Sequence, residues 1–572
     1  MDVLRHAEGL PALILSKADR MTERNASQVI VVGGGPVGLA SALELARFGV
    51  RTVLVEKHET TSRHPKTRNF NTRTMEIAKG WGDAVYRRLR GIDTPDGWKS
   101  PIRFLHSVTG EQFGMIESKG FEGPGPGISP AKPVMSSQEL IEEILLDAAR
   151  ATGLVDIRFG TEAIELLKGA DPSDTEVALR VVDRATQARE TLTGVALVAA
   201  DGAASPLREQ LGIRLEGPKN LHHIVNCYFR ADIERHIGDR KGVLLFVSNE
   251  NATGVLQPLD AAGRWLCQIT VKSEEWSLDT FTHRRAREWI RAAVGVDDLE
   301  PDIISLGLWK LNATVAERLV QGRVLLCGDA AHQFPPTGGL GVNTGLQGMH
   351  NAMWKLAHYV RGQAEWPLVE TYDTERREVS RRITSQSLEN SVNVQRIFAA
   401  AAGGGDSGLS TEEVVTVSRR YGNHLGVEFG AAYASTAVVA DGTQVPEVAD
   451  PYADYVQAAT PGCRAPHVPL NRGDAELSTL DLVGASFTLL AAPAGQAWCT
   501  AAAEASGHLG TAVDCYRIGA AGLTDHGGFV QAYGLHDDGA VLIRPDGYIA
   551  WRSPSGPADA GDLRKALSQI LA

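Results

Sequence analysis

A glycine-rich turn between a short apolar strand and a helix constrains the fold of this chain more than any other feature. Residues 28–32 read QVIVV, a β-branched run typical of a buried strand. The turn that follows has the pattern G-x-G-x-x-G, formed by Gly33, Gly35, Pro36, Val37 and Gly38. The first glycine permits a tight turn, the second lets the backbone approach a pyrophosphate, and the third lets helix and strand pack closely. A helix and a second strand follow, so the segment predicts a Rossmann-like α/β nucleotide-binding unit.

An acidic residue stands at the end of that second strand, at residues 52–56. Glu56 follows Gly33 by 23 residues and precedes Lys57, a spacing at which a carboxylate accepts hydrogen bonds from a ribose hydroxyl. An acid here disfavours a 2′-phosphate, so we expect the resident nucleotide to be FAD or NAD rather than NADP. Residues 403–408 also fit G-x-G-x-x-G, but no strand precedes them, and we interpret that segment as a flexible linker.

A second strand–loop–helix segment lies roughly 300 residues downstream. Residues 323–327 predict a strand that leads into Gly328 and Asp329, and a loop rich in glycine and proline follows. A helix is expected from near Asn343. An acid at a strand end, a glycine-rich loop and a helix N-terminus repeat the geometry of a nucleotide site. Two such loops in one chain indicate a single long ligand held at both ends.

The composition sets broad limits on the class of protein. The chain has 572 residues, 57 of them basic and 69 acidic, and the net charge of −12 argues against a dedicated nucleic-acid binder. No stretch approaches the roughly 18 apolar residues of a membrane span, so we expect no membrane partner and a cytoplasmic location. Six scattered cysteines predict neither a disulfide framework nor a zinc site. His222 and His223 have no third ligand nearby, so no metal is expected.

Three motifs in this order resemble those of the FAD-dependent aromatic hydroxylases, the single-component flavoprotein monooxygenases typified by para-hydroxybenzoate hydroxylase. They are the glycine turn with Glu56, an Asp-Gly motif at Asp201 with Arg208, and the Gly-Asp motif at Asp329. Residues 462–572 resemble the thioredoxin-like C-terminal domain of the branch that includes phenol, chlorophenol and polyketide hydroxylases. A single Cys499 at the place of the thioredoxin cysteine pair implies that this domain is structural.

The resemblance implies an α/β fold with three domains. A Rossmann-like FAD-binding domain (GR2-type) would carry an inserted antiparallel β-sheet substrate domain and precede the thioredoxin-like domain. Alternating polar and apolar residues between 221 and 310 also predict a half-exposed antiparallel sheet. The expected divisions are an N-terminal extension at 1–27, the FAD-binding domain at 28–95, 131–215 and 307–385, the substrate domain at 96–130 and 216–306, a helical connector at 386–464, and the thioredoxin-like domain at 465–572.

The resemblance also assigns cofactor contacts. The ADP half of FAD would lie against the first glycine turn, and Asp329 would bind the ribityl hydroxyls. The helix that begins near Asn343 would direct its positive end at the flavin pyrimidine edge, where reduced flavin is negative. NADPH or NADH would bind only transiently, since the chain has one Rossmann turn. The implied cofactor-binding residues are Gly33, Gly35, Pro36, Val37, Gly38, Glu56, Lys57, Arg68, Gln138, Asp201, Arg208, Asp329, Leu340, Gly341, Val342 and Asn343.

The implied activity is hydroxylation of a small aromatic substrate by O2 and NAD(P)H, through a flavin C4a-hydroperoxide. We assign Pro335 and Pro336 as catalytic residues beside the flavin and His332 as a candidate for proton delivery. Each also has a structural interpretation, because prolines stiffen a loop and a histidine can anchor one. The candidate substrate contacts, each of which could instead be a packing residue, are Tyr228, Gln257, Trp265 and Gln268.

The substrate class and several alternatives stay open at this point. Phenol hydroxylases have an acidic residue near position 68, and Arg68 here favours a bulky phenolic or heteroaromatic natural-product intermediate, as in antibiotic biosynthesis. A halophenol- or phenol-degrading hydroxylase is the first alternative. An epoxidase or Baeyer–Villiger enzyme on the same scaffold, a plain dehydrogenase and a flavin-fold binding protein without turnover are the others. We expect a homo-oligomer, a dimer or higher.

Overall fold

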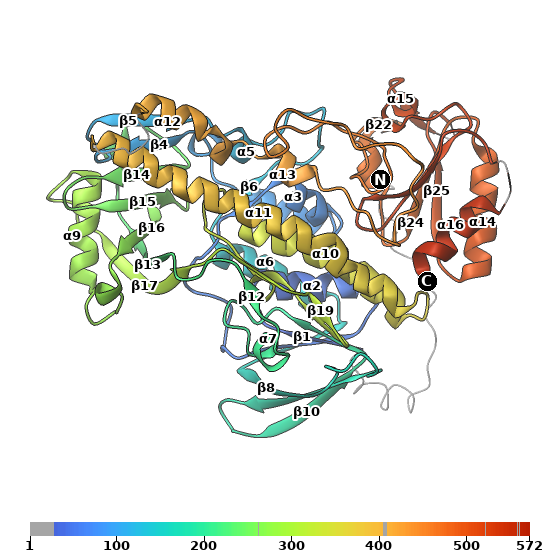
Figure 1. Ribbon diagram of the computed structural model, residues 1–572, viewed down its shortest axis with the longest axis horizontal. Coiled ribbons are helices and arrows are strands. Elements are labelled where there is room, and N and C mark those ends of the chain that lie inside the picture. Colours follow the sequence, from blue (N-terminus) through green and yellow to red (C-terminus); the bar gives the residue numbers. More distant parts are fainter. Residues whose placement is uncertain (1–27, 261, 404–408, 521, 558, 560) are drawn as a thin grey trace.

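The computed structural model describes residues 28–260, 262–403, 409–520, 522–557, 559 and 561–572. The expected N-terminal extension and residues 404–408 of the expected linker lie outside this described part. The molecule is elongated, with a sheet of seven strands at one end, a six-stranded sheet at the centre, and the C-terminal domain at the other end (Figure 1). No helix within the described ranges is both long and apolar enough to cross a membrane.

A six-stranded sheet in the order β19-β20-β11-β1-β2-β7 forms the centre of the molecule. Its neighbouring strands pair in parallel, except that β19 is antiparallel to β20. All four residues of β1 are buried, because both faces of the sheet are covered, and this explains the uninterrupted apolar run. The strands are β1 (Val29–Val32), β2 (Thr52–Glu56), β7 (Val155–Phe159), β11 (Ala196–Ala199), β19 (Val320–Gln321) and β20 (Val324–Leu326).

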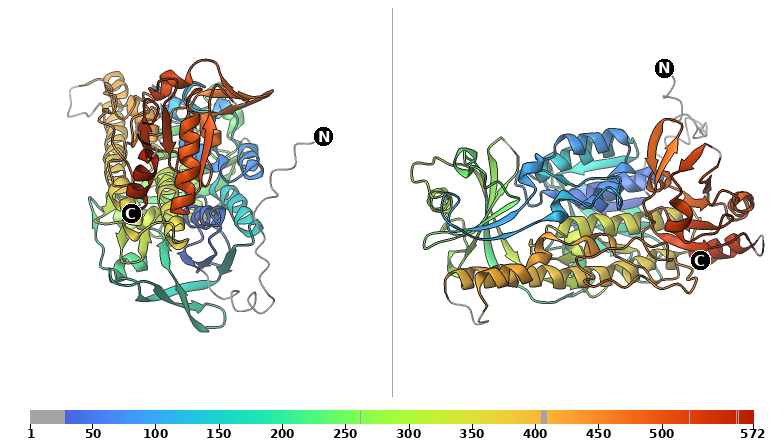
Figure 2. Two further views of the ribbon diagram at one scale, coloured as in Figure 1. Left: turned by 90° about the vertical axis from the view of Figure 1, so that its right-hand side faces the viewer. Right: turned by 90° about the horizontal axis from the view of Figure 1, so that it is seen from above.

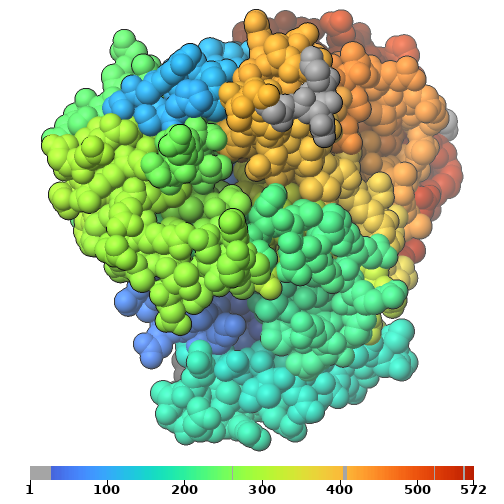
Figure 3. All heavy atoms as spheres, turned by 60° about the vertical axis from the view of Figure 1, so that its left-hand side comes forward, coloured from blue at the N-terminus to red at the C-terminus, as the bar shows by residue number. Residues whose placement is uncertain are grey.

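Helices and small sheets complete the central part. Helix α2 contacts both α6 and α10, and a three-stranded antiparallel sheet of β8, β9 and β10 projects from the lower side of the molecule (Figure 3). The helices are α2 (Pro36–Arg47), α3 (Thr72–Lys79), α4 (Asp83–Gly91), α6 (Gln138–Ala151), α7 (Pro206–Gln210) and α10 (Gly341–Val360). The remaining strands here are β3 (Asn69–Phe70), β6 (Val134–Met135), β8 (Thr161–Lys168), β9 (Val177–Asp183), β10 (Arg189–Gly194), β12 (Leu215–Glu216), β18 (Thr314–Ala316) and β21 (His332–Gln333).

A seven-stranded sheet in the order β17-β13-β16-β15-β14-β4-β5 forms the end of the molecule on the left of Figure 1. It is antiparallel apart from the pair β4 and β14. Helix α9 (His283–Val294) packs on one face, through the core that contains Trp265 and Trp289. The strands are β4 (Ile102–Leu105), β5 (Gln112–Ile116), β13 (His222–Arg230), β14 (Leu244–Ser248), β15 (Thr253–Pro258), β16 (Arg264–Val271) and β17 (Asp302–Leu311).

Helix α11 (Trp366–Ala401) connects the parts of the molecule. Its 36 residues give a length of about 54 Å, and it runs from beside the C-terminal domain to the seven-stranded sheet (Figures 1 and 2). Near its C-terminal end, Val394 and Ile397 share a core with Phe104 and Phe246 of the sheet. Short helices continue the connection: α12 (Thr411–Val417), η5 (Arg419–Gly422) and α13 (Leu425–Phe429).

The C-terminal domain contains a four-stranded sheet in the order β25-β24-β27-β28. Helices α14 (Gln496–Leu509) and α16 (Asp562–Leu571) contact each other there. The strands are β24 (Phe487–Ala491), β25 (Val513–Arg517), β27 (Ala540–Ile543) and β28 (Ile549–Ser553), with a small sheet of β22 (Pro469–Arg472), β23 (Ala475–Ser478) and β26 (Leu523–Asp525).

One cysteine prediction was wrong in part. Cys499 and Cys515 form a disulfide that joins the first turn of α14 to β25. The spacing of 16 residues carries no motif, and only the packing of α14 beside β25 brings the two side chains together. The other four cysteines, Cys227, Cys267, Cys327 and Cys463, are buried and free.

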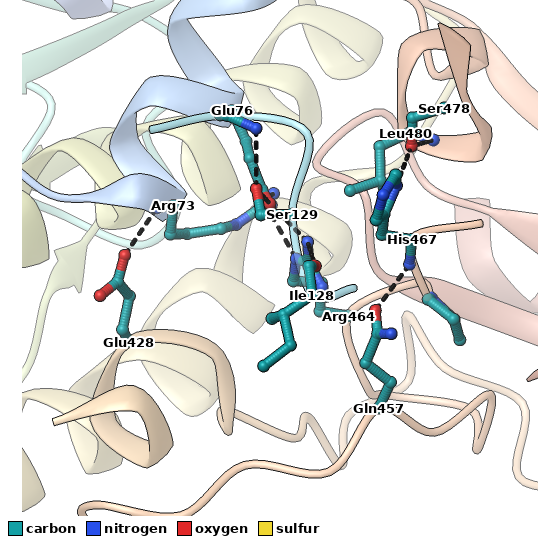
Figure 4. A network of polar contacts seen from close by, with 12 residues as sticks. Arg73, Glu76, Ile128, Ser129, Glu428, Gln457, Arg464, His467, Ser478 and Leu480 are labelled. Atoms are coloured by element: carbon teal, nitrogen blue, oxygen red, sulfur yellow. Dashed lines mark hydrogen bonds and ion pairs between the residues drawn. The ribbon is translucent and has the colours of Figure 1, made fainter. Parts of the chain in front are cut away.

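Buried ion pairs hold the C-terminal domain against the central part (Figure 4). Arg464, ahead of β22, pairs with Glu76 of α3, and Arg73 donates to the same carboxylate at 2.8 Å. Glu428 of α13 accepts a hydrogen bond from the Arg73 main-chain N–H at 2.8 Å. This contact region therefore joins three segments that are far apart in the sequence.

Candidate active site

The three glycines of the first turn have different surroundings. Gly33 has φ of +112°, and a Cβ there would lie 2.2 Å from the Ala200 carbonyl oxygen at the end of β11. A Cβ at Gly38 would lie 1.9 Å from the Gly33 carbonyl oxygen. A Cβ at Gly35 would meet no atom within 4 Å. Gly33 and Gly38 therefore serve the packing of turn, helix and strand, and Gly35 leaves open space at the N-terminus of α2 that fits a pyrophosphate.

Glu56 organises the backbone next to this turn. One carboxylate oxygen accepts the Gly34 N–H at 2.7 Å and the other accepts the His58 N–H at 2.9 Å. A carboxylate has further lone pairs, so these bonds orient Glu56 while leaving capacity for a ribose hydroxyl. Lys57 is exposed. Pro36 is the first residue of α2, where its missing N–H costs nothing.

The second loop meets the first through Val37. Side-chain atoms of Val37 lie 3.1 Å from a Cβ built on Gly328 and 2.8 Å from one built on Gly345 of α10. The glycines let the Gly-Asp loop and α10 approach α2 closely, which brings both predicted nucleotide loops to one place. Asp329 is exposed while its neighbours Gly328 and Ala330 are buried, so its carboxylate is accessible to a ligand.

The Asp-Gly motif fixes the loop after β11. Asp201 accepts the Ser205 hydroxyl at 2.7 Å and the Leu207 N–H at 3.2 Å, and burial raises the pKa of its carboxyl. Arg208 donates to the carbonyls of Ala203, Ala204 and Ala330. Since Ala330 follows Asp329, Arg208 links the Asp-Gly and Gly-Asp loops. The structure thus gives both residues a positioning role, and their direct contact with a cofactor stays a prediction.

The start of α10 is tied to the segment 69–74 by Asn343. Its Oδ1 accepts the Asn71 N–H at 2.9 Å and the Thr74 hydroxyl at 2.8 Å, and its Nδ2 donates to the carbonyls of Asn69 and Gly339. The side chain is therefore fully used within the protein. The group available to a flavin here is the N-terminal main chain of the helix, with its partial positive charge. This main chain belongs to Leu340, Gly341, Val342 and Asn343.

Gln138 and Arg68 have different neighbours. Gln138 accepts the main-chain N–H groups of Lys66 and Thr67 and donates to Glu142 at 2.6 Å, so it holds the 62–67 loop. Arg68 instead extends to the seven-stranded sheet, where it donates to Gln257 at 2.9 Å. The structure thus joins a predicted cofactor residue and a predicted substrate residue.

The predicted substrate residues divide between the two faces of the sheet. Tyr228 and Gln257 point away from the core under α9, and Gln268 pairs with Val255 on the same side as Gln257. Trp265 lies on the other face, packed edge-to-face on Trp98 in that core. This position separates Trp265 from the other three predicted substrate residues, and its contact with substrate stays a prediction. The position follows from strand alternation, because Trp265 shares its side with Cys267 and Ile269.

His332, Pro335 and Pro336 occupy the loop between β20 and α10. His332 is buried and stacks on Phe334 with ring centroids 4.6 Å apart, and burial lowers its pKa to about 3. A neutral, stacked imidazole favours the anchoring interpretation over proton delivery. Pro335 is buried and Pro336 is exposed. None of these observations tests the catalytic roles, which stay predictions.

Two polar residues at this site were not predicted. Asn69 is buried between Arg68 and Gly339, and both polar atoms of its amide lack a hydrogen-bond partner within the described chain. Tyr421 of η5 is buried beside Phe246, with ring centroids 5.9 Å apart. Asn69 follows Arg68 directly, so it could have been predicted as a site residue together with Arg68. No motif in the sequence around Tyr421 indicates that it lies at the site.

Comparison with known families agrees with this geometry. The family described as FAD binding domain matches residues 26–387, and the family described as aromatic-ring hydroxylase, C-terminal, matches residues 439–572. The chain belongs to the FAD-dependent aromatic-ring hydroxylases. It is 35% identical to a putative polyketide hydroxylase of Streptomyces halstedii, over 95% of this chain and 96% of the relative. It is 33% identical to a 4-methyl-5-nitrocatechol 5-monooxygenase of a Burkholderia species, over 95% and 97%.

Solved structures show the same similarity along the whole chain. The flavin-dependent monooxygenase PieE, in complex with FAD and substrate, matches with a TM-score of 0.87 and 30% identity, over 95% of this chain and 98% of that one. Aklavinone-11 hydroxylase, in a ternary complex with FAD and aklavinone, matches with a TM-score of 0.82 and 32% identity, over 96% and 99%. The predictions of family, fold class, FAD and enzyme class are confirmed.

The residues present fit FAD. Gly35 leaves the open space that a pyrophosphate needs, Glu56 is oriented for a ribose, and Gly345 near the start of α10 packs against Gly328, next to Asp329. When bound, FAD supplies redox chemistry that takes electrons from a reduced nicotinamide and uses O2 to oxygenate an aromatic ring. The chain contributes the binding surfaces and the positive end of α10, and buries Phe246 and Tyr421 near the junction of sheet and connector.

Proposed function

We propose that this monooxygenase hydroxylates a bulky phenolic or heteroaromatic ring in natural-product biosynthesis. The observation that carries the proposal is the match, over nearly the full chain, to solved complexes of flavin monooxygenases with their substrates. The relative from Streptomyces halstedii supports it, since its name refers to a polyketide. The residue at position 68 agrees with this proposal, because an acidic residue there would take a proton from a simple phenol and this chain has Arg68 instead.

The chain's own residues would serve this reaction by placement. Asn343 fixes the start of α10, whose positive end would stabilise negative charge on the reduced flavin. Arg208 fixes the two acidic loops to each other. Tyr228, Gln257 and Gln268 all lie on the sheet face opposite α9, which supports their role as substrate contacts. Pro335 and Pro336 would stiffen the loop before α10.

The deciding experiment supplies labelled dioxygen and NADPH or NADH with a panel of polycyclic phenols, heteroaromatics and simple phenols. We expect one labelled oxygen atom in the product of a polycyclic compound and weak activity with simple phenols. If labelled oxygen enters none of the products, the monooxygenase assignment is contradicted. A lactone or an epoxide instead of a phenol would indicate the Baeyer–Villiger or epoxidase alternative.

A second candidate is a hydroxylase that degrades a nitro- or halophenol. The relative named 4-methyl-5-nitrocatechol 5-monooxygenase and a 2,4-dichlorophenol 6-monooxygenase of Delftia acidovorans, 30% identical over 95% of this chain, favour it. In the same panel, preferred turnover of single-ring nitro- or chlorophenols would replace the polyketide proposal.

Asp329→Ala tests the cofactor assignment. We expect the variant to fold but to lose most of its FAD, because it lacks the carboxylate proposed to bind the ribityl hydroxyls. The flavin absorbance per protein after gel filtration measures this. Asp171→Ala, in an exposed loop, is the control and should keep its flavin. An Asp329→Ala protein with full flavin content would contradict the assignment.

Further properties are proposals that follow from the family. We propose a homo-oligomer, which light scattering would test, and a cytoplasmic location, which cell fractionation would test. We also propose the domain divisions given above, with the linker between 386 and 464 as the expected site of limited proteolysis.

A further inference from the structure

The two bonded cysteines of the C-terminal domain differ from the other cysteines in their exposure. Cys499 lies in the first turn of α14 and Cys515 in the middle of β25, and their sulfur atoms form the disulfide (Figure 1). Both residues are half-buried, whereas the other four cysteines are buried and free. Molecules in solution therefore reach this pair far more readily than the remaining thiols.

The position of Cys499 on α14 stabilises a negative sulfur. The helix has 14 residues, and its first turn, residues 496–499, carries no acidic side chain. The partial positive charge at the start of a helix stabilises a thiolate, which is the reactive form of a thiol. Cys515 lies in a strand, where the peptide dipoles nearly cancel. Once the disulfide is reduced, Cys499 is thus the more reactive of the two sulfurs.

The packing of α14 is extensive apart from the disulfide. Trp498, next to Cys499, is fully buried, packs edge-to-face on Trp551 and donates from Nε1 to the Asp538 carbonyl at 3.0 Å. Ala501, Ala502 and Ala505 belong to the same apolar core. These contacts hold the helix against the domain, so we expect α14 to stay in place when the disulfide is reduced.

A hydrogen bond also keeps the two cysteines near each other. Ser506 Oγ accepts the Val513 N–H at 3.1 Å, which ties the second half of α14 to the start of β25. The two thiols of the reduced protein therefore remain side by side, and the disulfide can form again without a large rearrangement. β25 is the edge strand of the four-stranded sheet, and an edge strand is open to an extended segment of another chain.

We propose that Cys499 and Cys515 form a thiol–disulfide exchange site, which exchanges two electrons with a pair of cysteines in another protein. This activity goes beyond the hydroxylation reaction. It also fits the cytoplasmic location proposed above, because disulfides of cytosolic proteins are usually transient and take part in redox reactions.

The exchange proceeds through a mixed disulfide. A thiolate of the partner protein attacks Sγ of Cys499, and the electron pair of the broken S–S bond goes to Cys515, which takes up a proton. The second thiolate of the partner then attacks the partner sulfur of the mixed disulfide, and Cys499 leaves as a thiolate. The partner is oxidised to a disulfide, and the pair in this chain is reduced. The same steps in reverse reduce a disulfide of the partner.

The first experiment counts free thiols in the folded, FAD-loaded protein. The protein is treated with oxidised glutathione or with dithiothreitol, alkylated in denaturant and weighed by mass spectrometry. Since two of the six cysteines are bonded, we expect four alkylated cysteines after oxidation and six after reduction. Circular dichroism and flavin absorbance should stay unchanged in both states. A disulfide that resists dithiothreitol until the protein unfolds would overturn the proposal and identify the bond as a structural cross-link.

The second experiment measures exchange with a protein disulfide, with insulin as the probe and dithiothreitol as the electron donor. We expect the unchanged protein to accelerate the reduction of insulin, and the double variant Cys499→Ser, Cys515→Ser to give no acceleration. Cys463→Ser, which removes a buried free thiol of the same part of the chain, is the control and should keep the full acceleration. An unchanged protein that does not accelerate the reaction would contradict the proposal.

The single variants test the role of each sulfur. Cys515→Ser protein should form a mixed disulfide with oxidised glutathione several-fold faster than Cys499→Ser protein, and equal rates would refute Cys499 as the attacking thiol. If the serine variants do not fold, iodoacetamide treatment of the reduced, unchanged protein replaces them, and the alkylated protein should lose the acceleration.

The result is independent of the flavin reaction. If labelled oxygen enters an aromatic product but insulin reduction is not accelerated, only this inference fails. If exchange occurs in a protein that oxygenates no aromatic compound, the proposed function fails and the exchange site stands.

Discussion

The glycines of the first turn show how one motif combines packing and ligand space. Gly33 and Gly38 are crowded by main-chain carbonyl oxygens of Ala200 and Gly33, whereas Gly35 faces open space. The crowding at Gly33 and Gly38 and the open space at Gly35 follow from the pattern and its strand–helix context, so the sequence was sufficient to predict this geometry, whereas pyrophosphate binding at Gly35 stays a prediction. The reason is that a parallel strand pair and a helix N-terminus leave few alternatives for the backbone between them.

Alanine substitutions should separate these roles. Gly38→Ala places a Cβ 1.9 Å from a carbonyl oxygen, so the backbone must shift, and we expect about 2 kcal/mol or more of destabilisation in the FAD-free protein. Gly35→Ala meets no protein atom, so the FAD-free protein should keep its unfolding midpoint while FAD binds at least about tenfold more weakly. Urea unfolding and flavin titration measure the two effects.

Gly91→Ala is the control for both variants. Its Cβ would also meet nothing within 4 Å, but it lies in α4, away from the turn, and should alter neither stability nor FAD affinity by much. A Gly35→Ala protein that binds FAD normally would show that the open space is not the pyrophosphate site.

Other site residues depend on contacts that no local pattern contains. Asn343 was predicted as a flavin contact, but its amide is consumed by Asn71, Thr74 and two carbonyls. Tyr421 reaches the site only because α11 carries the connector back to the sheet. These contacts join segments that are far apart in the sequence. A single sequence does not show which of its segments come together in the fold, so these contacts could not be predicted.

At the scale of elements, strand alternation divides the residues of the seven-stranded sheet between its two faces. In β16, Trp265, Cys267 and Ile269 face the core under α9, so Gln268 must face the other side. The period of two in the sequence is enough to separate Trp265 from Gln268. Which face looks toward the flavin could not be predicted, because it depends on how the whole sheet is placed.

Asn343→Ala should loosen α10 from its neighbours. The substitution leaves two donors and two acceptors without a partner, and at about 1–3 kcal/mol for each buried unsatisfied group we expect a loss of about 3 kcal/mol or more. FAD affinity should fall with it, because the helix N-terminus is no longer fixed. Urea unfolding with and without FAD would measure both.

Asn249→Ala is a matched control for this change. Asn249 also makes four hydrogen bonds, with His106, Asn251, Ala252 and Ala292, but it lies in a partly exposed turn. Water can replace its contacts, so the loss should be less than half as large. Equal losses in the two variants would mean that burial of the α10 contacts is not what matters.

The contact of α13 with α3 should make stability depend on pH. Glu428 is buried, one of its oxygens has no partner among the described residues, and burial raises its pKa from 4.5 to about 8. Between these values the folded protein holds a proton that the unfolded chain has lost. Stability from this group is therefore full below the lower value and falls as pH rises toward 8.

Glu428→Gln should remove this dependence, because glutamine resembles the protonated acid and does not ionise. We expect equal stability of variant and unchanged protein near the lower value, and a more stable variant by about 2 kcal/mol or more at the upper one. Urea unfolding at a series of pH values measures it, with Glu370→Gln on the exposed side of α11 as control. A difference that does not change with pH would show that Glu428 ionises normally.

At the scale of the whole molecule, a buried set of charges joins the C-terminal domain to the central part. Glu375 of α11 accepts from Lys355 of α10 at 2.7 Å and from Arg544, after β27, at 2.7 and 2.9 Å. Arg544 also pairs with Asp546, and all four side chains are buried. Burial lowers the pKa of Lys355 to about 8, although Glu375 opposes this effect. Two acids therefore balance two bases across the domain boundary.

Glu375→Gln should unbalance this set. The substitution keeps the shape of the side chain but leaves Lys355 and Arg544 with one carboxylate between them. Removing one partner of a buried ion pair typically costs about 3–5 kcal/mol, so we expect a loss of about 3 kcal/mol or more. The midpoint of thermal unfolding should fall, and the C-terminal domain should be released by limited proteolysis at lower protease concentrations.

Glu378→Gln, one turn along α11 with an exposed side chain, should change stability by less than about 0.5 kcal/mol. If both variants behave alike, the C-terminal domain is held by its apolar contacts, such as Phe487 against Trp354, rather than by the ion pairs.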